Sequence, residues 1–559
     1  MSPASLRGRR IAPKRRRQSS SRRAALVARY RHLRGSCMSR ALALDPHHSV
    51  TVQQAIDVVR GRRRVELSPA ARERMLASRE LLDRMVAEKR RVYGVTTGYG
   101  PLATQYIDPA QSAELQRKLI YHLATGVGEP FAPVYVRALM FARAVSLSRG
   151  ASAVRPRAVE LILDCLEHDI LPVIPSLGTV GASGDLTPLA HMALALLGEA
   201  DVMYDGQRRP AAEVFDEVGL EPLDIAHKEG LGLVNGTSAM TGLALVNQTD
   251  TDRAFDLALR LAVLYAELLE GRREAWDPLL GRLRPHPGQG SVHERLMALS
   301  ASSARLQPIP DEPARLDLAG DGPVDHGRDL PQDAYTLRCI PQLFGAVLDT
   351  LDFHGQTVAR ELDSVTDNPV FDVENGRVVH GGNFYGQHIS FASDALSNAI
   401  IKLAVHAERA VARVTDPTLN GGLPAFMQGN HTGLNSGFMG AQVTASALIA
   451  EMRTKSSPAS IQSVPTNANN QDVVTMGTIS ALRASQLLER LYEVLAIEAM
   501  VLVQGFELVG GFERDDFCES SQNIAHWVRA RSAFVDEDRS LSAEIQSLAK
   551  ALKTTPTIP

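Results

Sequence analysis

The chain has 559 residues, of which 5% are aromatic and 22% are charged, and its formal net charge is −3. It is longer than one compact core usually allows, but no Pro/Gly/Ser-rich linker divides its middle, so we expect one large body or a closely fused pair of domains. The four cysteines show no CxxC spacing, which favours neither a zinc site nor a disulfide framework and fits a reducing, cytoplasmic compartment.

The first 40 residues carry a strong positive charge. They hold 13 of the 60 lysines and arginines and no acid, so the remaining residues are acidic on balance. An acidic body argues against a nucleic-acid groove, which requires clustered positive charge. These first 40 residues, the basic arm, lack the apolar core of a secretory signal. We expect residues 1–45 to be a disordered basic extension. Translation starting at Met38, a polyanion-binding tail and an organelle transit segment are the alternative interpretations.

Apolar periodicity after the arm indicates mostly helices. Residues 50–52 predict a short strand, and residues 53–60 a helix. Residues 111–200 show three or four helical periods. Loops at residues 126–133 and 172–184 interrupt these periods, so the second loop should lead directly into a helix.

Three long helical runs follow, at residues 387–414, 437–453 and 473–508. Helices of this length are stable only when packed side by side, so we expect a mostly α fold with a long antiparallel central helix bundle. Within the last run, residues 494–503 are too short and too polar to span a bilayer, and they predict a buried helix with no membrane partner. Residues 303–329, rich in Pro, Asp and Gly, predict an exposed excursion.

Ala182-Ser183-Gly184 is the most informative segment of the chain. With its flanks, it resembles the signature of the aromatic amino acid ammonia-lyases and aminomutases. The resemblance implies that the tripeptide cyclises into 4-methylideneimidazol-5-one (MIO), a strong electrophile. The residue types suit this chemistry, because the Gly184 nitrogen can approach the Ala182 carbonyl with little hindrance and Ser183 loses its hydroxyl to leave a methylene. By itself, the tripeptide is more typical of a flexible turn before a helix than of a cofactor.

A glycine-rich segment, YGVTTGYG, runs from Tyr93 to Gly100 and lacks the GKS/T pattern of a phosphate loop. It resembles the lid loop of the same family, in which the opening tyrosine is the catalytic base. The resemblance implies that Tyr93 removes a proton and that Gly100 borders the substrate. Such a base requires a site that stabilises phenolate, and the glycines would let the loop move.

Four further motifs follow in the order of the family, at residues 232–240, 332–339, 380–387 and 463–472. The resemblance implies a catalytic role for Tyr335 and contacts to substrate or electrophile for Asn235, Arg338, Phe384, Asn467 and Gln471. Arginine suits two-pronged binding of a substrate carboxylate. The resemblance covers about residues 50–510. The chain departs from the family pattern at Asp363, where Asn is expected. It also lacks the extra helical region of plant enzymes, which suggests a bacterial-type enzyme.

His122 and Leu123 stand where phenylalanine-specific members resemble Phe-Leu and histidine-specific members resemble Ser-His. Histidine can hydrogen-bond a phenol hydroxyl, and a buried phenol without a partner costs about 1 to 3 kcal/mol. Gln471 stands where histidine lyases carry Glu, and a neutral amide suits a cationic imidazole poorly. Both positions favour L-tyrosine as the substrate, with trans-4-coumarate and ammonia as products.

The resemblance also implies the organisation of the whole protein, in the fumarase/aspartase-like superfamily. We expect an N-terminal domain with the lid and MIO loops at residues 46–230, the central bundle at 231–515 and a helical tail at 516–559. The family builds each active site from three chains of a homotetramer with 222 symmetry, and neither a metal nor an external cofactor is implied. A tyrosine 2,3-aminomutase, a histidine or phenylalanine ammonia-lyase and an inactive helical scaffold remain open alternatives.

Overall fold

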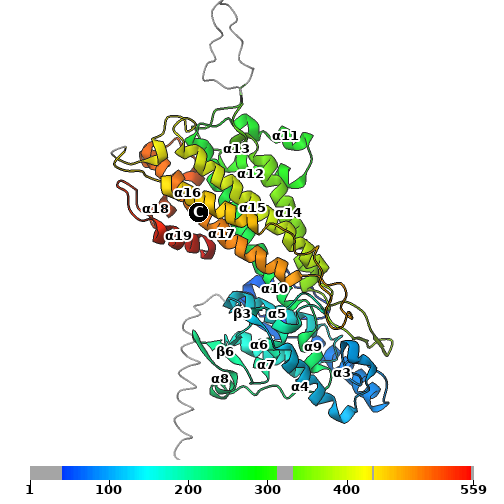
Figure 1. Cartoon of the computed structure of the whole chain (residues 1–559). Helices are drawn as coiled ribbons and strands as arrows, with labels where there is room; N and C mark the ends of the chain where they lie inside the picture. Colours follow the sequence, from blue (N-terminus) through cyan, green and yellow to red (C-terminus); the bar gives the residue numbers. More distant parts are fainter. Residues whose placement is uncertain (1–40, 311–331, 431–432, 556–559) are drawn as a thin grey trace, which may run out of the picture.

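The computed structural model describes residues 41–310, 332–430 and 433–555. Most of the expected basic extension and of the expected excursion at 303–329 lies outside the described residues. Residues 42–44, at the end of the expected extension, instead form β1 (Leu42–Leu44), whose two leucines are buried. Figure 1 shows a mixed domain, coloured blue to teal, from which a long helix bundle, coloured green to orange, extends.

The N-terminal domain combines helices with small sheets. Its helices are α2 (Val52–Val59), α3 (Pro69–Ala87), α4 (Ser112–Leu123), α5 (Pro133–Ser148), α6 (Pro156–Glu167), α7 (Leu186–Leu196), α8 (Ala211–Val218) and α9 (Glu229–Val234). β1 pairs in parallel with β2 (Val65–Leu67), β3 (Val127–Pro130) pairs antiparallel with β5 (Pro175–Leu177), and β6 (Asp201–Tyr204) lies between β4 (Leu171–Pro172) and β7 (Gln207–Pro210).

The strand predicted at residues 50–52 is wrong. Thr51 instead caps α2: its side chain accepts a hydrogen bond from the Gln54 N–H, and the Gln54 side chain accepts one from the Thr51 N–H. This capping box satisfies backbone donors at the helix start, which outweighs the strand preference of the two valines. The four helices α4 to α7 confirm the helical periods predicted for residues 111–200.

The central bundle confirms the mostly helical fold. It consists of α10 (Ser238–Leu268), α14 (Ile340–Leu362), α15 (Gln387–Thr415), α16 (Met439–Thr454) and α17 (Gly477–Leu508). α16 and α17 begin a few residues later than predicted, because Gly437 and Met476 have left-handed φ angles of 56° and 54°. α11 (Pro278–Leu283), α12 (Pro287–Leu299), α13 (Tyr335–Arg338), α18 (Glu519–Arg529), α19 (Ser542–Thr554) and the hairpin β8 (Val370–Asp372) with β9 (Arg377–Val379) complete the named helices and strands.

α10, α15 and α17 run in the same direction. Their starts meet at Met240, since a Cβ on Gly386 or on Gly477 would lie 2.2 or 2.5 Å from the Met240 Sδ. α14 is antiparallel to them, because Glu361 near its end accepts a hydrogen bond of 2.5 Å from Thr237, directly before α10. Three long helices therefore begin at the junction with the N-terminal domain, and the predicted antiparallel arrangement holds for α14 but not among these three.

The first half of α10 packs closely on α5 and thereby joins the two parts of the chain. Gly242 makes this possible: a Cβ there would lie 2.5 Å from the Leu139 backbone nitrogen. Glycine inside a helix costs conformational entropy, but here it lets two backbones approach. The domain division expected from the sequence is not tested by this contact and stays a prediction.

The apolar stretch 494–503 of α17 is buried throughout, as predicted. Among the described residues, no helix combines the length and the apolar character needed to cross a membrane. Glu498 is 1% exposed, and neither of its carboxyl oxygens has a hydrogen-bond partner among the described residues. Burial raises the pKa of this carboxyl from 4.5 to about 8.

Glu498→Gln should remove a pH-dependent loss of stability. Between pH 5 and 8 the unfolded chain releases the Glu498 proton while the folded protein retains it, so folded stability falls as pH rises, by roughly 3 kcal/mol over this window. We expect the gain in Tm of the variant over the wild type to be larger at pH 8 than at pH 5. Glu374→Gln, at an exposed position, is the control and should show no such trend. Parallel Tm profiles for wild type and Glu498→Gln would contradict the prediction.

Candidate active site

A cavity of about 740 Å³ lies where the N-terminal domain meets the starts of α10, α15 and α17. Ten of the thirteen residues that the sequence singled out line it: Tyr93, Gly100, His122, Leu123, Ala182, Ser183, Asn235, Phe384, Asn467 and Gln471. Gly184 is buried directly behind Ser183. Tyr335 and Arg338 do not line this cavity and lie in another part of the structure.

Ser183 and Gly184 form a tight left-handed turn in the cavity wall, with φ angles of 54° and 76°. The left-handed conformation costs a non-glycine residue about 1 to 2 kcal/mol. Backbone pairing holds the turn: Gly236 donates to the Ser183 carbonyl at 3.3 Å, and Asp185 donates to the Gly236 carbonyl at 2.7 Å. A Cβ on Gly184 would lie 2.2 Å from the Gly236 carbonyl oxygen. The tripeptide is thus folded back and fixed, unlike a flexible turn.

The turn lies close to several helix starts. α7 begins two residues after Gly184, and the buried Asp185 carboxylate accepts hydrogen bonds from the Met240 N–H of α10, at 2.8 Å, and from the Thr478 hydroxyl of α17. Burial raises the pKa of Asp185 to about 6, although these hydrogen bonds oppose the shift. Helix N-termini carry partial positive charge, so the turn lies in a setting that favours negative charge.

Gln471 contacts the turn directly. Its Nε2 lies 3.3 Å from the Ser183 Oγ, while its Oε1 accepts hydrogen bonds from the Thr466 hydroxyl at 2.7 Å and from the Asn467 Nδ2 at 2.8 Å. These two donors orient the amide so that its NH2 group faces Ser183. A glutamate at this position would have no proton to donate when ionised.

Tyr93 lines the cavity with its hydroxyl held by its own loop: the Gly100 N–H donates to the Tyr93 Oη at 2.8 Å. The neighbouring Tyr99 packs edge-on against its ring, with 6.3 Å between the ring centroids. Burial, and to a lesser degree the charge of Tyr93, raises the pKa of Tyr99 far above its usual value, although the Gln116 amide donates to it at 2.8 Å. Tyr99 therefore stays neutral beside Tyr93.

Close packing accounts for two glycines of the Tyr93 loop. A Cβ on Gly94, where φ is +67°, would lie 2.7 Å from Leu231 Cδ2, and one on Gly98 would lie 2.6 Å from the Leu102 carbonyl oxygen. The sequence-based idea that these glycines let the loop move stays a prediction.

Asn235 lies before α10 and is 3% exposed. Its Nδ2 donates to Asp367 Oδ1 at 3.0 Å and to the Asn368 carbonyl at 3.2 Å. Because both amide hydrogens are engaged, the side-chain oxygen is the group left to accept a hydrogen bond from a molecule in the cavity.

His122 belongs to the last turn of α4, and its Nδ1 lies 3.2 Å from the Lys118 carbonyl oxygen. A carbonyl oxygen only accepts, so this bond places the ring proton on Nδ1. Nε2 is then an acceptor for a hydroxyl group in the cavity.

Tyr335 and Arg338 form α13, which lies at the far end of the bundle from α7 and α9 (Figure 1). Thr336 of α13 contacts Tyr265, which is about 40 Å along α10 from the start of that helix. Tyr335 is 71% exposed, and the Arg338 guanidinium lies 4.5 Å from the centre of its ring. Within the described part of the chain, Arg338 forms no ion pair.

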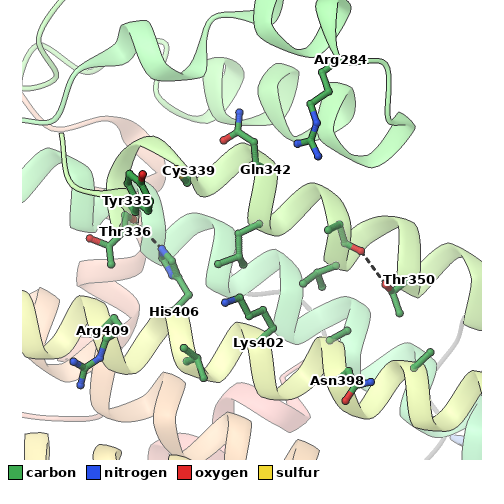
Figure 2. Close-up of a pocket in the computed structure, with 16 residues that line it drawn as sticks. Arg284, Tyr335, Thr336, Cys339, Gln342, Thr350, Asn398, Lys402, His406 and Arg409 are labelled. Carbon is green, nitrogen blue, oxygen red and sulfur yellow. Dashed lines mark hydrogen bonds between the residues drawn. The ribbon is translucent and has the colours of Figure 1, made fainter. Parts of the chain in front are cut away.

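A second cavity, of about 650 Å³, borders α13 between α14 and α15 (Figure 2). There the Thr336 carbonyl accepts a hydrogen bond of 2.9 Å from the His406 Nε2, and the Tyr265 hydroxyl lies 2.8 Å from the Thr336 Oγ1. Burial lowers the pKa of His406 to about 4, so the ring is neutral and its single proton lies on Nε2. These two bonds fix the short helix that carries Tyr335 and Arg338.

Sequence reasoning missed Lys118 and Asn368, which also line the first cavity. Lys118 lies one helical turn before His122, a spacing that places both on one helix face and was therefore a usable signal. Asn368 has no comparable local signal. Asp363, the departure from the family pattern, lies outside the cavity, where it forms an ion pair with Arg149 and accepts a hydrogen bond from Val50.

Comparison with known proteins identifies the family. A model of the aromatic amino acid lyases matches residues 50–530. The chain belongs to the aromatic amino acid lyase family. It is 46% identical to a tyrosine ammonia-lyase of Cereibacter sphaeroides, over 92% of this chain and 97% of that protein. It is 42% identical to a histidine ammonia-lyase of Deinococcus radiodurans, over 88% and 90%.

The tyrosine aminomutase of Streptomyces globisporus has a similar structure, with a TM-score of 0.85 at 35% identity over 92% of this chain and 97% of that one. These findings confirm the resemblance drawn from the motifs. This lyase is therefore an enzyme of the aromatic amino acid ammonia-lyase class, with the helical fold that the sequence predicted.

Gly184→Ala should destabilise the lyase more than Gly206→Ala. Both glycines are left-handed, with φ angles of 76° and 74°, so both alanines pay the same conformational cost. Of the two, only Gly184 would place the new methyl group against a fixed backbone carbonyl, since no atom of the described residues lies within 4 Å of a Cβ at Gly206. Thermal unfolding of both variants should show a clearly larger fall in Tm for Gly184→Ala. Equal falls would mean that the close approach to Gly236 is not required.

Proposed function

We propose that this lyase converts L-tyrosine to trans-4-coumarate and ammonia. The observation that carries the proposal is one cavity that combines the Ser183 turn, the Tyr93 hydroxyl and the acceptor nitrogen of His122. The identity to the Cereibacter sphaeroides tyrosine ammonia-lyase supports the same substrate.

We further propose that Ala182, Ser183 and Gly184 provide the MIO group. The residues present fit it: the turn is folded back, Gly184 has no room for a side chain, and the Ser183 Oγ lies 3.3 Å from Gln471. The MIO ring supplies an electrophile that makes the substrate amine a leaving group. Gln471 and the nearby helix starts favour negative charge at this place.

Tyr93 is the proposed base. Its oxygen takes the proton from the substrate β-carbon, the electrons of that C–H bond form the Cα–Cβ double bond, and the Cα–N bond breaks to release ammonia. The Gly100 N–H, 2.8 Å from the Tyr93 Oη, stabilises negative charge on the phenol oxygen.

His122 is the proposed contact for the substrate ring. With the Nδ1 proton bound to the Lys118 carbonyl, Nε2 accepts the hydrogen of the phenol hydroxyl. Phenylalanine would leave this acceptor without a partner, whereas histidine would bring a ring for which Gln471 offers no negative charge.

Arg338 is the proposed contact for the substrate carboxylate, contributed by another copy of the chain. It lies at the far end of the bundle from Ser183, so it can reach a substrate at that turn only across a subunit boundary. A homotetramer with shared active sites, as in the family, meets this requirement. The exposed Tyr335 ring that stacks on Arg338 then lies in the same shared site.

The deciding experiment is an absorbance assay with L-tyrosine, L-phenylalanine and L-histidine. Tyrosine should yield the conjugated product coumarate in the 290 to 310 nm region, and Ser183→Ala should yield none while it remains folded. Intact-mass spectrometry should show that the wild type, but not the variant, has lost water from this segment. Formation of β-tyrosine without coumarate would identify an aminomutase, and urocanate from histidine would overturn the substrate. No turnover of any of these substrates would favour a scaffold.

Tyr93→Phe should lower kcat by several orders of magnitude while substrate binding is retained. The substitution removes only the oxygen that takes the proton, so the loss appears in kcat rather than KM. Tyr99→Phe is a matched control, because its hydroxyl is buried and bonded to Gln116. A near-normal rate for Tyr93→Phe in steady-state assays would remove Tyr93 from the mechanism.

His122→Phe should reverse the substrate preference. The variant leaves the tyrosine hydroxyl unpaired and no longer offers phenylalanine an unsatisfied imidazole, a change of about 1 to 3 kcal/mol for each substrate and at least tenfold in the ratio of kcat/KM. Both substrates are measured by the absorbance of coumarate and cinnamate. An unchanged ratio would place His122 outside the ring-binding part of the cavity.

A further inference from the structure

Three charged side chains form a buried cluster beneath the cavity. Lys228, Asp367 and Arg143 are each at most 1% exposed, and the Lys228 Nζ lies 2.8 Å from Asp367 Oδ2. They come from the start of α9, from the segment between α14 and β8, and from α5. None of them lines either cavity described above.

The cluster holds Asn235 from two sides. Asp367 uses its second oxygen, Oδ1, to accept a hydrogen bond of 3.0 Å from the Asn235 Nδ2. Arg143 Nη1 donates to the Asn235 backbone carbonyl at 2.8 Å. The same carboxylate therefore binds the buried ammonium with one oxygen and the site amide with the other.

Asn235 is also joined to the Ser183 turn through its neighbour. Gly236 pairs by its N–H and carbonyl with Ser183 and Asp185. A Cβ on Gly236 would lie 2.2 Å from the Thr366 carbonyl oxygen and 2.3 Å from the Arg143 Nη1. A displacement of the Arg143 side chain would therefore also displace Gly236 and, through it, the Ser183 turn.

Burial of these three charged groups costs solvation free energy, so stability alone does not explain the cluster. Burial lowers the pKa of Lys228 and would raise that of Asp367, but the charges of Lys228 and Arg143 outweigh burial at Asp367 and lower its pKa, so the carboxyl is ionised. Buried ion pairs often contribute no more stability than apolar side chains of similar volume. Their charge-assisted hydrogen bonds are, however, stronger and more directional than neutral ones.

We propose that Lys228, Asp367 and Arg143 are positioning residues that fix the Asn235 amide with its oxygen toward the cavity. None of the three lines the cavity, and Lys228 reaches Asn235 through the Asp367 carboxylate. The inference rests on the proposed deamination, in which Asn235 contacts the substrate beside the Ser183 turn.

A double-mutant cycle between Lys228 and Asn235 tests this role. Lys228→Met, Asn235→Ala and the double variant are compared with the wild type in kcat, KM and Tm. A misplaced contact group can cost about a hundredfold in rate, and we expect such a loss for Lys228→Met in the wild-type background. In the Asn235→Ala background, where the positioned amide is absent, the same substitution should cost less than about threefold, because residues that act through one another are not additive.

The control removes an ion pair away from the cavity. Arg60→Met breaks the pair with Asp250, which joins the end of α2 to α10. It should lower Tm, but its effect on kcat/KM should be small and the same in both backgrounds. The fall in Tm on Lys228→Met should likewise be the same in the wild-type and the Asn235→Ala backgrounds, which separates positioning from a loss of stability.

Two further measurements keep the test decisive. If Lys228→Met does not fold, the cycle is run with the combined Lys228→Gln and Asp367→Asn exchange, which removes one positive and one negative charge together. For variants without measurable turnover, calorimetric binding of trans-4-coumarate replaces kcat/KM. Equal losses in both backgrounds would overturn the proposal, as would a neutral pair that costs no activity or affinity. Failure of the proposed function would appear differently, as a wild type that does not release coumarate from tyrosine.

Discussion

The site depends on a close approach of two backbones, at Gly184 and Gly236. Neither position has room for a side chain, since a Cβ on either would lie 2.2 Å from a carbonyl oxygen. The pairing holds Ser183 in its left-handed conformation and brings the start of α7 beside the start of α10. The strained conformation of Ser183 thus persists because the contacts of the surrounding backbone allow no other.

Polar groups around this approach are buried, and their contacts form one connected set. Asp185 joins the turn to α10 and α17, while Asp367 joins Asn235 to Lys228. A buried carboxylate without such partners would lose several kcal/mol of solvation. Glu498 illustrates the other solution, because it has no partner among the described residues and its pKa is raised to about 8. Asp185 and Asp367 near the turn are therefore ionised at physiological pH, whereas Glu498 in the middle of α17 is neutral.

The length of the helix bundle separates the predicted site residues into two groups, one at each end of the bundle. α10, α15 and α17 start at the Ser183 turn, and α13 lies at their other ends, fixed by His406 and Tyr265 through Thr336. Rigid helices cannot shorten this distance, so the chain presents Arg338 at one end of the bundle and the Ser183 turn at the other. This arrangement suits an assembly in which the α13 end of one copy lies beside the Ser183 turn of another copy.

Local sequence patterns were enough to predict the long helices and part of the cavity lining. Helical periodicity predicted α15 and α17 to within a few residues, and the resemblance of the motifs to a known family selected ten residues that line one cavity. The strand at 50–52 failed, since Thr51 and Gln54 form a cap that strand propensity ignores. The contact of Lys228 with Asp367, 139 positions away, and the separation of Arg338 from Ser183 could not be predicted and are known from the fold. Such contacts depend on how the helices pack, which no local pattern records.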